Sequence, residues 1–238
     1  MKTILKKAIH VIIVWLDSHG YSFSYYARNS GWLKHRTIRR VIRKTTILSY
    51  PRLLAVLDAI DYLERNRIAG DIVVCGVWRG GLVRAICDYM LHSKKRVIWA
   101  YDTFDGNPEP EECDGTVAKR IWHRGFLGVS EEQVRTNIGS PDNVRFVKGD
   151  ILTTLKEHKP EKIALMYLDT DWYASTRHEL KELYPLVSPG GVVVQDDFGI
   201  FPGAQQATED YFEEQGHKPL LVRLDVDARL WTKPAIVQ

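Results

Sequence analysis

Two short apolar runs that each end in a pair of aspartates constrain the fold of this chain more than any other part of its sequence. The runs Ile163–Leu168 and Val192–Val194 are continuously apolar, which is typical of parallel strands buried on both faces. The acids that follow them are Asp169 and Asp171 after the first run, and Asp196 and Asp197 after the second. In an open α/β sheet, ligands bind outside the carboxyl ends of the strands. The sequence therefore predicts that these four carboxylates gather at a ligand site.

The chemistry of four carboxylates suggests a hard cation. Magnesium prefers carboxylate oxygens and keeps water or substrate among its ligands, so three closely placed aspartates would suit it. The alternative is that the aspartates cap the helices expected near Tyr173 and Gly203. Capping accounts for one aspartate per helix and leaves the pairing unexplained.

Length and composition predict one globular domain. The chain has 238 residues, of which 45% are hydrophobic, and α/β domains of this size are commonly single. The three cysteines lack the spacing of a zinc site, which suits a reducing, cytoplasmic compartment. A net charge of +3 is too small to indicate nucleic-acid binding.

The charge is concentrated at the N-terminus, where residues 1–44 carry ten Lys or Arg residues and a single acid, Asp17. The apolar run Ala8–Leu16 is far shorter than the roughly 20 residues of a spanning helix, and no small-residue cleavage site follows it. We expect a basic, aromatic helical extension over residues 1–44, ahead of the main domain at 45–238. The favoured reading is that it packs on the domain or on a second subunit, and we expect the protein to be a homo-oligomer. The other reading is peripheral contact with an anionic membrane at its cytoplasmic face.

From Pro51 onward, helical and strand patterns alternate. Arg52–Arg65 and Gln205–Gln215 have helical periodicity, and Thr103–Gly128 is so rich in glycine and proline that we expect a loop or lid. The predicted strands are Ile72–Val77, Arg96–Asp102, Val144–Gly149, Ile163–Asp169 and Gly191–Asp196, followed by a hairpin of Leu220–Leu224 and Arg229–Thr232. This order predicts an α/β fold with a doubly wound, mostly parallel sheet of seven strands, the last of them antiparallel.

The first strand-to-helix turn, residues 74–81, is where such a fold binds a nucleotide-like cofactor. It matches neither the G-x-G-x-x-G fingerprint nor the P-loop. Gly76 and Gly80 would let the backbone approach a ligand that lacks a pyrophosphate, and Asp102 is placed for two ribose hydroxyls. An aspartate at this position does not distinguish a site for NAD from a site for S-adenosylmethionine. The alternative is that the glycines serve only close packing of strand and helix.

Several motifs occur together in an order that resembles one known family. They are Gly70–Asp71, Cys75–Gly81, Tyr101–Gly106, Leu168–Asp171, Leu183–Pro185, Ser188–Gly191 and Asp196–Asp197. The chain is similar over roughly Thr46 to Gly216 to the macrocin O-methyltransferases, which methylate hydroxyls on sugars of macrolide and aminocoumarin antibiotics. The resemblance implies a class I, Rossmann-like fold that uses S-adenosylmethionine and magnesium.

The resemblance also implies roles for individual residues. By position, the metal ligands are Asp169, Asp196 and Asp197, the general base is Asp171, the cofactor loop is Gly76, Val77, Trp78, Arg79, Gly80 and Gly81, and the ribose and adenine ends match Asp102 and Asp150. Val74 stands where the family usually has a glutamate. The basic N-terminus is a second departure, and it makes a glycolipid or polysaccharide acceptor as plausible as a soluble glycoside.

The same residues suggest a mechanism. A sugar hydroxyl has a pKa far above 7, so methyl transfer benefits from a Lewis acid and a base. Asp171 follows Asp169 by two residues, and in extended backbone both would face the same side. His123, within the predicted lid, is the second candidate base. The alternatives are a catechol-type small-molecule methyltransferase, an RNA methyltransferase and a non-catalytic cofactor-binding scaffold. An RNA methyltransferase usually works without a cluster of aspartates and needs a continuous basic surface.

Overall fold

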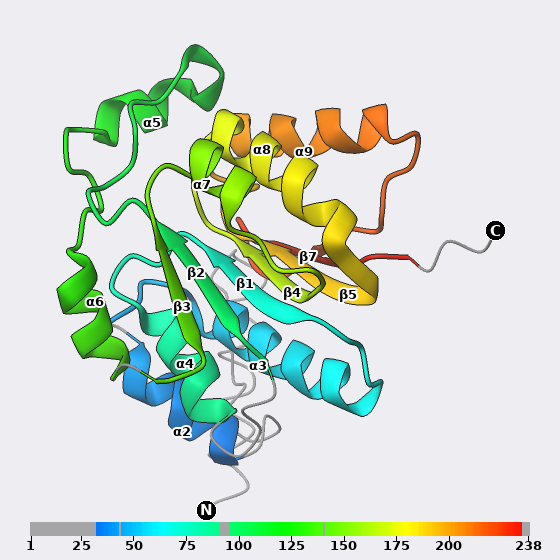
Figure 1. The fold of residues 1–238 in the computed structure, drawn as a ribbon. Helices are drawn as coiled ribbons and strands as arrows, with labels where there is room; N and C mark the ends of the chain where they lie inside the picture. The colour runs from blue at the N-terminus through cyan, green and yellow to red at the C-terminus, as the bar shows by residue number, and fades with distance from the viewer. Residues whose placement is uncertain (1–31, 43, 91–95, 140, 235–238) are drawn as a thin grey trace, which may run out of the picture.

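A seven-stranded sheet forms the centre of the protein, in the order β3-β2-β1-β4-β5-β7-β6 (Figure 1). The structure is a computed structural model that describes residues 32–42, 44–90, 96–139 and 141–234. The strands are β1 Asp71–Cys75, β2 Ile98–Asp102, β3 Val144–Lys148, β4 Ile163–Leu168, β5 Val187–Gln195, β6 Val222–Arg223 and β7 Arg229–Thr232. All seven predicted strands are present, with ends that differ by a few residues.

The direction of the strands confirms the doubly wound fold. Strands β1 to β5 run parallel, and β7 pairs antiparallel with both β5 and β6. Every residue of β4 is buried, because helices cover both faces of the sheet. The chain leaves β1 toward β2 and β3 and later returns to β4 on the other side of β1. In such sheets, this switch point is where the ligand crevice opens.

Helices form one layer on each face of the sheet (Figure 1). The first layer contains α2 Trp32–Val41, α3 Tyr50–Arg65, α4 Gly81–Tyr89 and α6 Glu131–Ile138, and the second contains α7 Ile151–Glu157, α8 Tyr173–Leu183, the short η3 Tyr184–Leu186 and α9 Pro202–Glu214. The layers enclose separate hydrophobic cores, around Leu57 and Ile86 on one face and around Leu180 and Phe212 on the other. The sheet is thus held from both sides, which fixes its carboxyl edge.

The described end of the basic N-terminal segment packs on the domain. Ile38 and Val41 of α2 are buried in the same core as α3 and α4, and the Lys34 ammonium lies 2.6 Å from carboxylates of both Asp58 and Asp61. Residues 1–31, with the membrane and subunit contacts expected of them, lie outside the described residues. Within the described part of the chain, we find no helix with the length and apolar character needed to cross a membrane.

The segment Thr103–Gly128 is more regular than the sequence predicts. It contains a 3-10 helix, η2 Glu112–Asp114, and a short helix, α5 Gly115–Ile121, so the prediction of a loop throughout is wrong. Ala118 of α5 is buried against Trp172 and Phe201. The Asp114 carboxylate accepts the backbone N–H groups of Glu111 at 2.8 Å and Tyr173 at 2.7 Å. The segment is therefore docked on the starts of α8 and α9.

Candidate active site

Two adjoining cavities open at the carboxyl ends of the parallel strands, and residues that follow β1 and β4 line both of them. The larger, of about 390 Å³, has the four predicted acids Asp169, Asp171, Asp196 and Asp197 in its lining. The smaller, of about 60 Å³, reaches Asp150 and Ile151 at the start of α7. Both are lined by Gly76, Asp102, Asn107 and Asp169. One elongated site therefore extends from the end of β3 to the end of β5.

The structure brings only part of the predicted cofactor loop to this site. Gly76 and Trp78 line the larger cavity, whereas Val77, Arg79, Gly80 and Gly81 line neither. The Arg79 guanidinium instead lies 4.7 Å from the centre of the Trp78 ring. An added Cβ would lie 2.7 Å from Ile138 at Gly80 and 2.4 Å from the Thr45 carbonyl oxygen at Gly81. Close packing is thus sufficient reason for these two glycines.

Asp102 holds the cofactor loop in an unusual conformation. Its carboxylate accepts the N–H groups of Val77 at 2.7 Å, Trp78 at 2.9 Å and Phe104 at 2.8 Å. Trp78 has a φ of 45° and Phe104 a φ of 56°, in the left-handed region that costs a non-glycine residue about 1 kcal/mol or more. A carboxylate has about four acceptor positions, so one remains for a ligand hydroxyl. Asp150 is exposed and accepts the Leu152 N–H as the cap of α7.

Three of the acids form a tight cluster. Carboxylate oxygens of Asp169, Asp171 and Asp197 all lie within 4.8 Å of one another. Asp171 has a φ of 68°, so the extended backbone predicted here is wrong and a left-handed turn places its carboxylate in the cluster. The Asn107 amide donates to Asp171 Oδ2, while Asp197 Oδ2 is buried and has no hydrogen-bond donor.

Burial makes this cluster costly to ionise. It raises the pKa of Asp171 to about 6, and burial together with repulsion from neighbouring carboxylates raises the pKa of Asp169 and Asp197 well above the ordinary range. A divalent cation would offset that repulsion and would fill the unsatisfied position at Asp197. The donor set therefore fits a hard metal ion.

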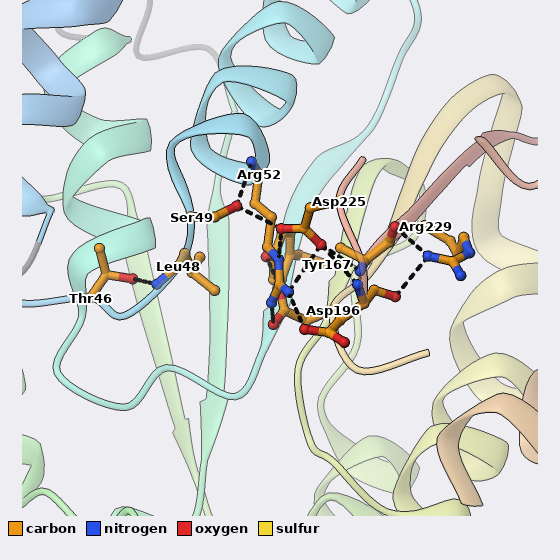
Figure 2. Close-up of polar contacts among 10 residues, drawn as sticks. Thr46, Leu48, Ser49, Arg52, Tyr167, Asp196, Asp225 and Arg229 are labelled. Carbon is orange, nitrogen blue, oxygen red and sulfur yellow. Dashed lines mark hydrogen bonds and ion pairs between the residues drawn. The ribbon is translucent and has the colours of Figure 1, made fainter. Parts of the chain in front are cut away.

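Asp196 is bound by the side chains of Tyr167 and Arg52 (Figure 2). Its Oδ1 accepts the hydroxyl of the buried Tyr167, and its Oδ2 pairs with the guanidinium of Arg52. Burial and the neighbouring Asp197 raise the pKa of Asp196 to about 7. Of the three metal ligands predicted from the family resemblance, the structure places Asp169 and Asp197 together, with Asp171 beside them.

Arg52, which the sequence did not single out, links three segments of the chain. In Figure 2 its guanidinium lies between Asp196 at the end of β5 and the β6–β7 turn. There Nε is 2.7 Å from Asp225 and Nη2 is 3.0 Å from Asp227. Ser49, the cap of α3, also donates to Asp225, at 2.7 Å. The start of α3 and the C-terminal turn are thereby fixed around one end of the acid cluster.

Removing this guanidinium is expected to destabilise the fold strongly. The Arg52 side chain is only 12% exposed, and Arg52→Met would leave three carboxylates without their cation, at a cost of about 3 kcal/mol in unfolding free energy. The control is Arg65→Met on the same helix, where the side chain is 80% exposed and pairs with Asp61 at 3.8 Å, so the cost is below about 0.5 kcal/mol. Urea denaturation measures both. Equal losses in the two variants would contradict this role for Arg52.

His123 does not reach the cluster. It is exposed beyond the end of α5 and lines neither cavity, and its ring packs edge-on against Phe126 at 5.7 Å between ring centres.

Another residue that the sequence did not indicate lies behind the acids. The fully buried Glu179 of α8 accepts the Thr170 hydroxyl at 2.9 Å, and burial raises its pKa to about 8.

The comparison with protein families shows which family the chain belongs to. Residues 36–233 match the family model of macrocin O-methyltransferase (TylF). The chain belongs to this family. It is 34% identical over 200 residues to the demethyldecarbamoylnovobiocin O-methyltransferase of Streptomyces niveus, covering 79% of this chain and 75% of that enzyme. It is 32% identical, over 80% of this chain and 76% of the relative, to an 8-demethyl-8-(2,3-dimethoxy-alpha-L-rhamnosyl)-tetracenomycin-C 4'-O-methyltransferase of Streptomyces olivaceus.

Solved structures agree with the family. The O-methyltransferase NovP superimposes with a TM-score of 0.74 at 30% identity, covering 80% of this chain and 83% of NovP. The calicheamicin methyltransferase CalS11 shares the fold at 18% identity, with a TM-score of 0.58 over 88% of this chain and 93% of that one. The protein is therefore an S-adenosylmethionine-dependent O-methyltransferase, and the prediction of this enzyme class is confirmed.

Proposed function

We propose that the enzyme transfers a methyl group from S-adenosylmethionine to a sugar hydroxyl of a glycoside, and that it needs magnesium. The observation that carries the proposal is the cluster of Asp169, Asp171 and Asp197 in the lining of a cavity that also contains Gly76 and Asp102. The named relatives support the acceptor class, since one of them is a rhamnosyl-tetracenomycin methyltransferase.

Residues on the β1–β3 side of the site would hold the cofactor. S-adenosylmethionine supplies an electrophilic methyl group. Gly76 and Trp78 line the larger cavity, Asp150 lines the smaller, and Asp102 lies between them with one acceptor position free for a ribose hydroxyl. Val77, Arg79, Gly80 and Gly81 belong to the same turn and shape it from outside the cavities.

The acid cluster would prepare the acceptor. A magnesium ion supplies a Lewis acid that lowers the pKa of a bound hydroxyl. Asp169 and Asp197 would bind the ion. The family pattern makes Asp196 the third ligand, whereas closeness to Asp169 and Asp197 favours Asp171. We assign Asp196 to the metal and Asp171 to the proton, as the family pattern implies. In the protein without a metal ion, burial raises the pKa of Asp171 to about 6.

Asp171→Asn tests this assignment. The change keeps the shape of the side chain, and asparagine tolerates the left-handed φ of 68°, so only basicity is lost. We expect kcat to fall by about 10²–10⁴-fold, with the dissociation constants of S-adenosylhomocysteine and magnesium nearly unchanged. Steady-state kinetics and calorimetric titration measure both. A large loss of magnesium affinity would instead make Asp171 a metal ligand, and unchanged kcat would exclude it as the base.

The predicted homo-oligomer and the predicted membrane contact rest on residues 1–44, most of which lie outside the described residues. Both remain predictions. Sedimentation of the full chain and its binding to anionic liposomes would test them separately.

A further inference from the structure

We infer that Asn107 is a positioning residue for methyl transfer, which holds the Asp171 carboxylate in place to take a proton from the acceptor hydroxyl. The inference rests on the proposed function, in which Asp171 is the base. It gives a role in the reaction to the segment Thr103–Gly128, which contacts the acid cluster through this side chain.

Asn107 lies where the two cavities of the site meet. It lines both the larger cavity, which contains the acid cluster, and the smaller one, which reaches Asp150. Its amide donates to Asp171 Oδ2. Because this oxygen is held, the rotation of the Asp171 carboxylate is fixed, and with it the direction of the second oxygen, Oδ1. Asn107 is thus placed to orient the proposed base.

Asp171 needs such a partner, because the proposed metal ion would otherwise draw it away from the acceptor. An oxygen of its carboxylate lies within 4.8 Å of oxygens of Asp169 and Asp197. A magnesium ion on those two residues would attract Asp171 as a further ligand. The amide of Asn107 opposes that movement. It is a neutral donor, so it binds the carboxylate without cancelling its charge.

Asn107 is itself held in place by neighbours in its own segment. The indole N–H of Trp122 donates to the Asn107 carbonyl oxygen at 3.0 Å, and the backbone N–H of Asn107 donates to the Phe126 carbonyl oxygen at 2.9 Å. The Thr103 hydroxyl donates to the Gly106 carbonyl oxygen at 2.8 Å, which fixes the turn that precedes Asn107. Support of this kind keeps a group near the chemistry in a productive geometry.

A second contact joins the same two segments one residue further along. The indole N–H of Trp172 donates to the Pro108 carbonyl oxygen at 2.9 Å, and Trp172 is buried. Since Trp172 follows Asp171 and Pro108 follows Asn107, the two hydrogen bonds lie at adjacent positions in each segment. Together they restrain one segment against the other, so the Asn107 amide stays on the Asp171 carboxylate.

A leucine at position 107 tests the inference. Leucine has a volume close to that of asparagine but no hydrogen-bond donor, and Asn107 is not one of the residues with a positive φ, so its backbone suits leucine. We expect the rate constant of methyl transfer to fall by about 10- to 100-fold in Asn107→Leu, the usual effect of losing one hydrogen bond to a charged group. The KM for S-adenosylmethionine and the dissociation constants of S-adenosylhomocysteine and magnesium should stay within about threefold of wild type.

The rates are measured with the full-length protein, magnesium, S-adenosylmethionine labelled in its methyl group, and a panel of methyl glycosides that includes methyl α-L-rhamnoside. Single-turnover conditions keep slow variants measurable. Asn143→Leu is the matched control. The Asn143 amide donates to the Arg96 carbonyl oxygen at 3.2 Å, and Asn143 precedes β3 at the opposite edge of the sheet. This variant should keep the wild-type rate and both affinities.

A double-mutant cycle separates orientation of the base from a general effect on the fold. If Asn107 acts through Asp171, then Asn107→Leu should slow the Asp171→Asn enzyme by less than about twofold. A purely structural role would slow both backgrounds by the same factor, and that result would overturn the inference. So would a fall of tenfold or more in magnesium affinity, which would make Asn107 a support for a metal ligand.

Failure of the inference and failure of the proposed function give different results. A wild-type rate in Asp171→Asn, or no transfer by the wild-type protein to any glycoside of the panel, would contradict the proposed function. A slow Asp171→Asn with equal losses from Asn107→Leu in both backgrounds would contradict the inference alone. If Asn107→Leu does not bind S-adenosylhomocysteine, Asn107→Asp replaces it in the cycle, since aspartate keeps the shape and exchanges the donor for an acceptor, and the same non-additivity is expected.

Discussion

Asp197→Asn is expected to lower methyl transfer by at least about 10²-fold and, in metal-free protein, to raise the midpoint of thermal unfolding. Both effects follow from one cause. Asp197 lies in a buried group of like charges, and its Oδ2 has no donor to offset the cost of burial. An amide there keeps the shape and is neutral without taking up a proton. The cost of ionising or protonating a buried carboxyl group therefore disappears, while a hard metal ion loses a charged ligand.

The expected gain in stability is about 1–2 kcal/mol. Two like charges 4 Å apart at an effective dielectric constant of about 20 repel by about 4 kcal/mol, and partial protonation already relieves some of that repulsion. Active sites commonly trade stability for function in this way. Thermal unfolding with EDTA measures the gain.

Magnesium provides the second measurement, because it stabilises whichever form binds it. The wild-type unfolding midpoint should rise with magnesium concentration, and that of Asp197→Asn should not. Asp105→Asn, at an exposed position in the lid segment, should behave as wild type in all respects. Full turnover in excess EDTA, or a midpoint in Asp197→Asn that still rises with magnesium, would show that the cluster does not bind the ion.

The positions of the strands along the chain and the location of the site could be predicted because both depend on local sequence patterns. A strand buried on both faces must be apolar along its whole length, as Ile163–Leu168 is, and the residue after such a strand lies at the sheet edge where ligands bind. The four acids were therefore placed at the right edge of the sheet. The lid was misjudged, since α5 is stabilised by its contacts with Trp172 and Phe201 from other elements.

The detailed grouping of the acids could not be predicted, because it depends on contacts between distant residues. Asp196 is occupied by Arg52, which is 144 positions away in the chain, and no local pattern around an arginine in a helix indicates such a partner. Asp171 joins the cluster through a left-handed turn rather than through extended backbone. Glu179 looks like any surface glutamate of a helix, and only the structure shows that it is fully buried.

The glycines of the turn over residues 74–81 are needed for different reasons, some for packing and one at the ligand site. Gly80 and Gly81 are explained by close packing, whereas Gly76 lies between the ends of β1 and β4 in the lining of both cavities. Gly76 has a φ of +85°, and an added Cβ would lie 1.9 Å from the backbone oxygen of Asp169. No rotamer change relieves a contact with backbone, so one of the two strand ends would have to move.

Gly76→Ala is therefore expected to cost about 4 kcal/mol or more in unfolding free energy and to abolish binding of S-adenosylhomocysteine. Gly125→Ala is the matched control. Gly125 has a φ of +81°, almost that of Gly76, but an added Cβ there meets nothing within 4 Å. Its expected cost is only the conformational one, about 1–2 kcal/mol, with ligand binding retained.

Both variants pay the cost of an alanine at positive φ. The difference between their losses of unfolding free energy therefore gives the cost of the contact between the strand ends. Urea denaturation gives the two free energies, and calorimetry gives the affinity for S-adenosylhomocysteine. Since the displaced oxygen belongs to Asp169, a movement of that residue should also weaken magnesium binding in Gly76→Ala, so cofactor and metal sites should fail together. Equal costs in the two variants, or loss of one ligand without the other, would show that the ends of β1 and β4 are not coupled through Gly76.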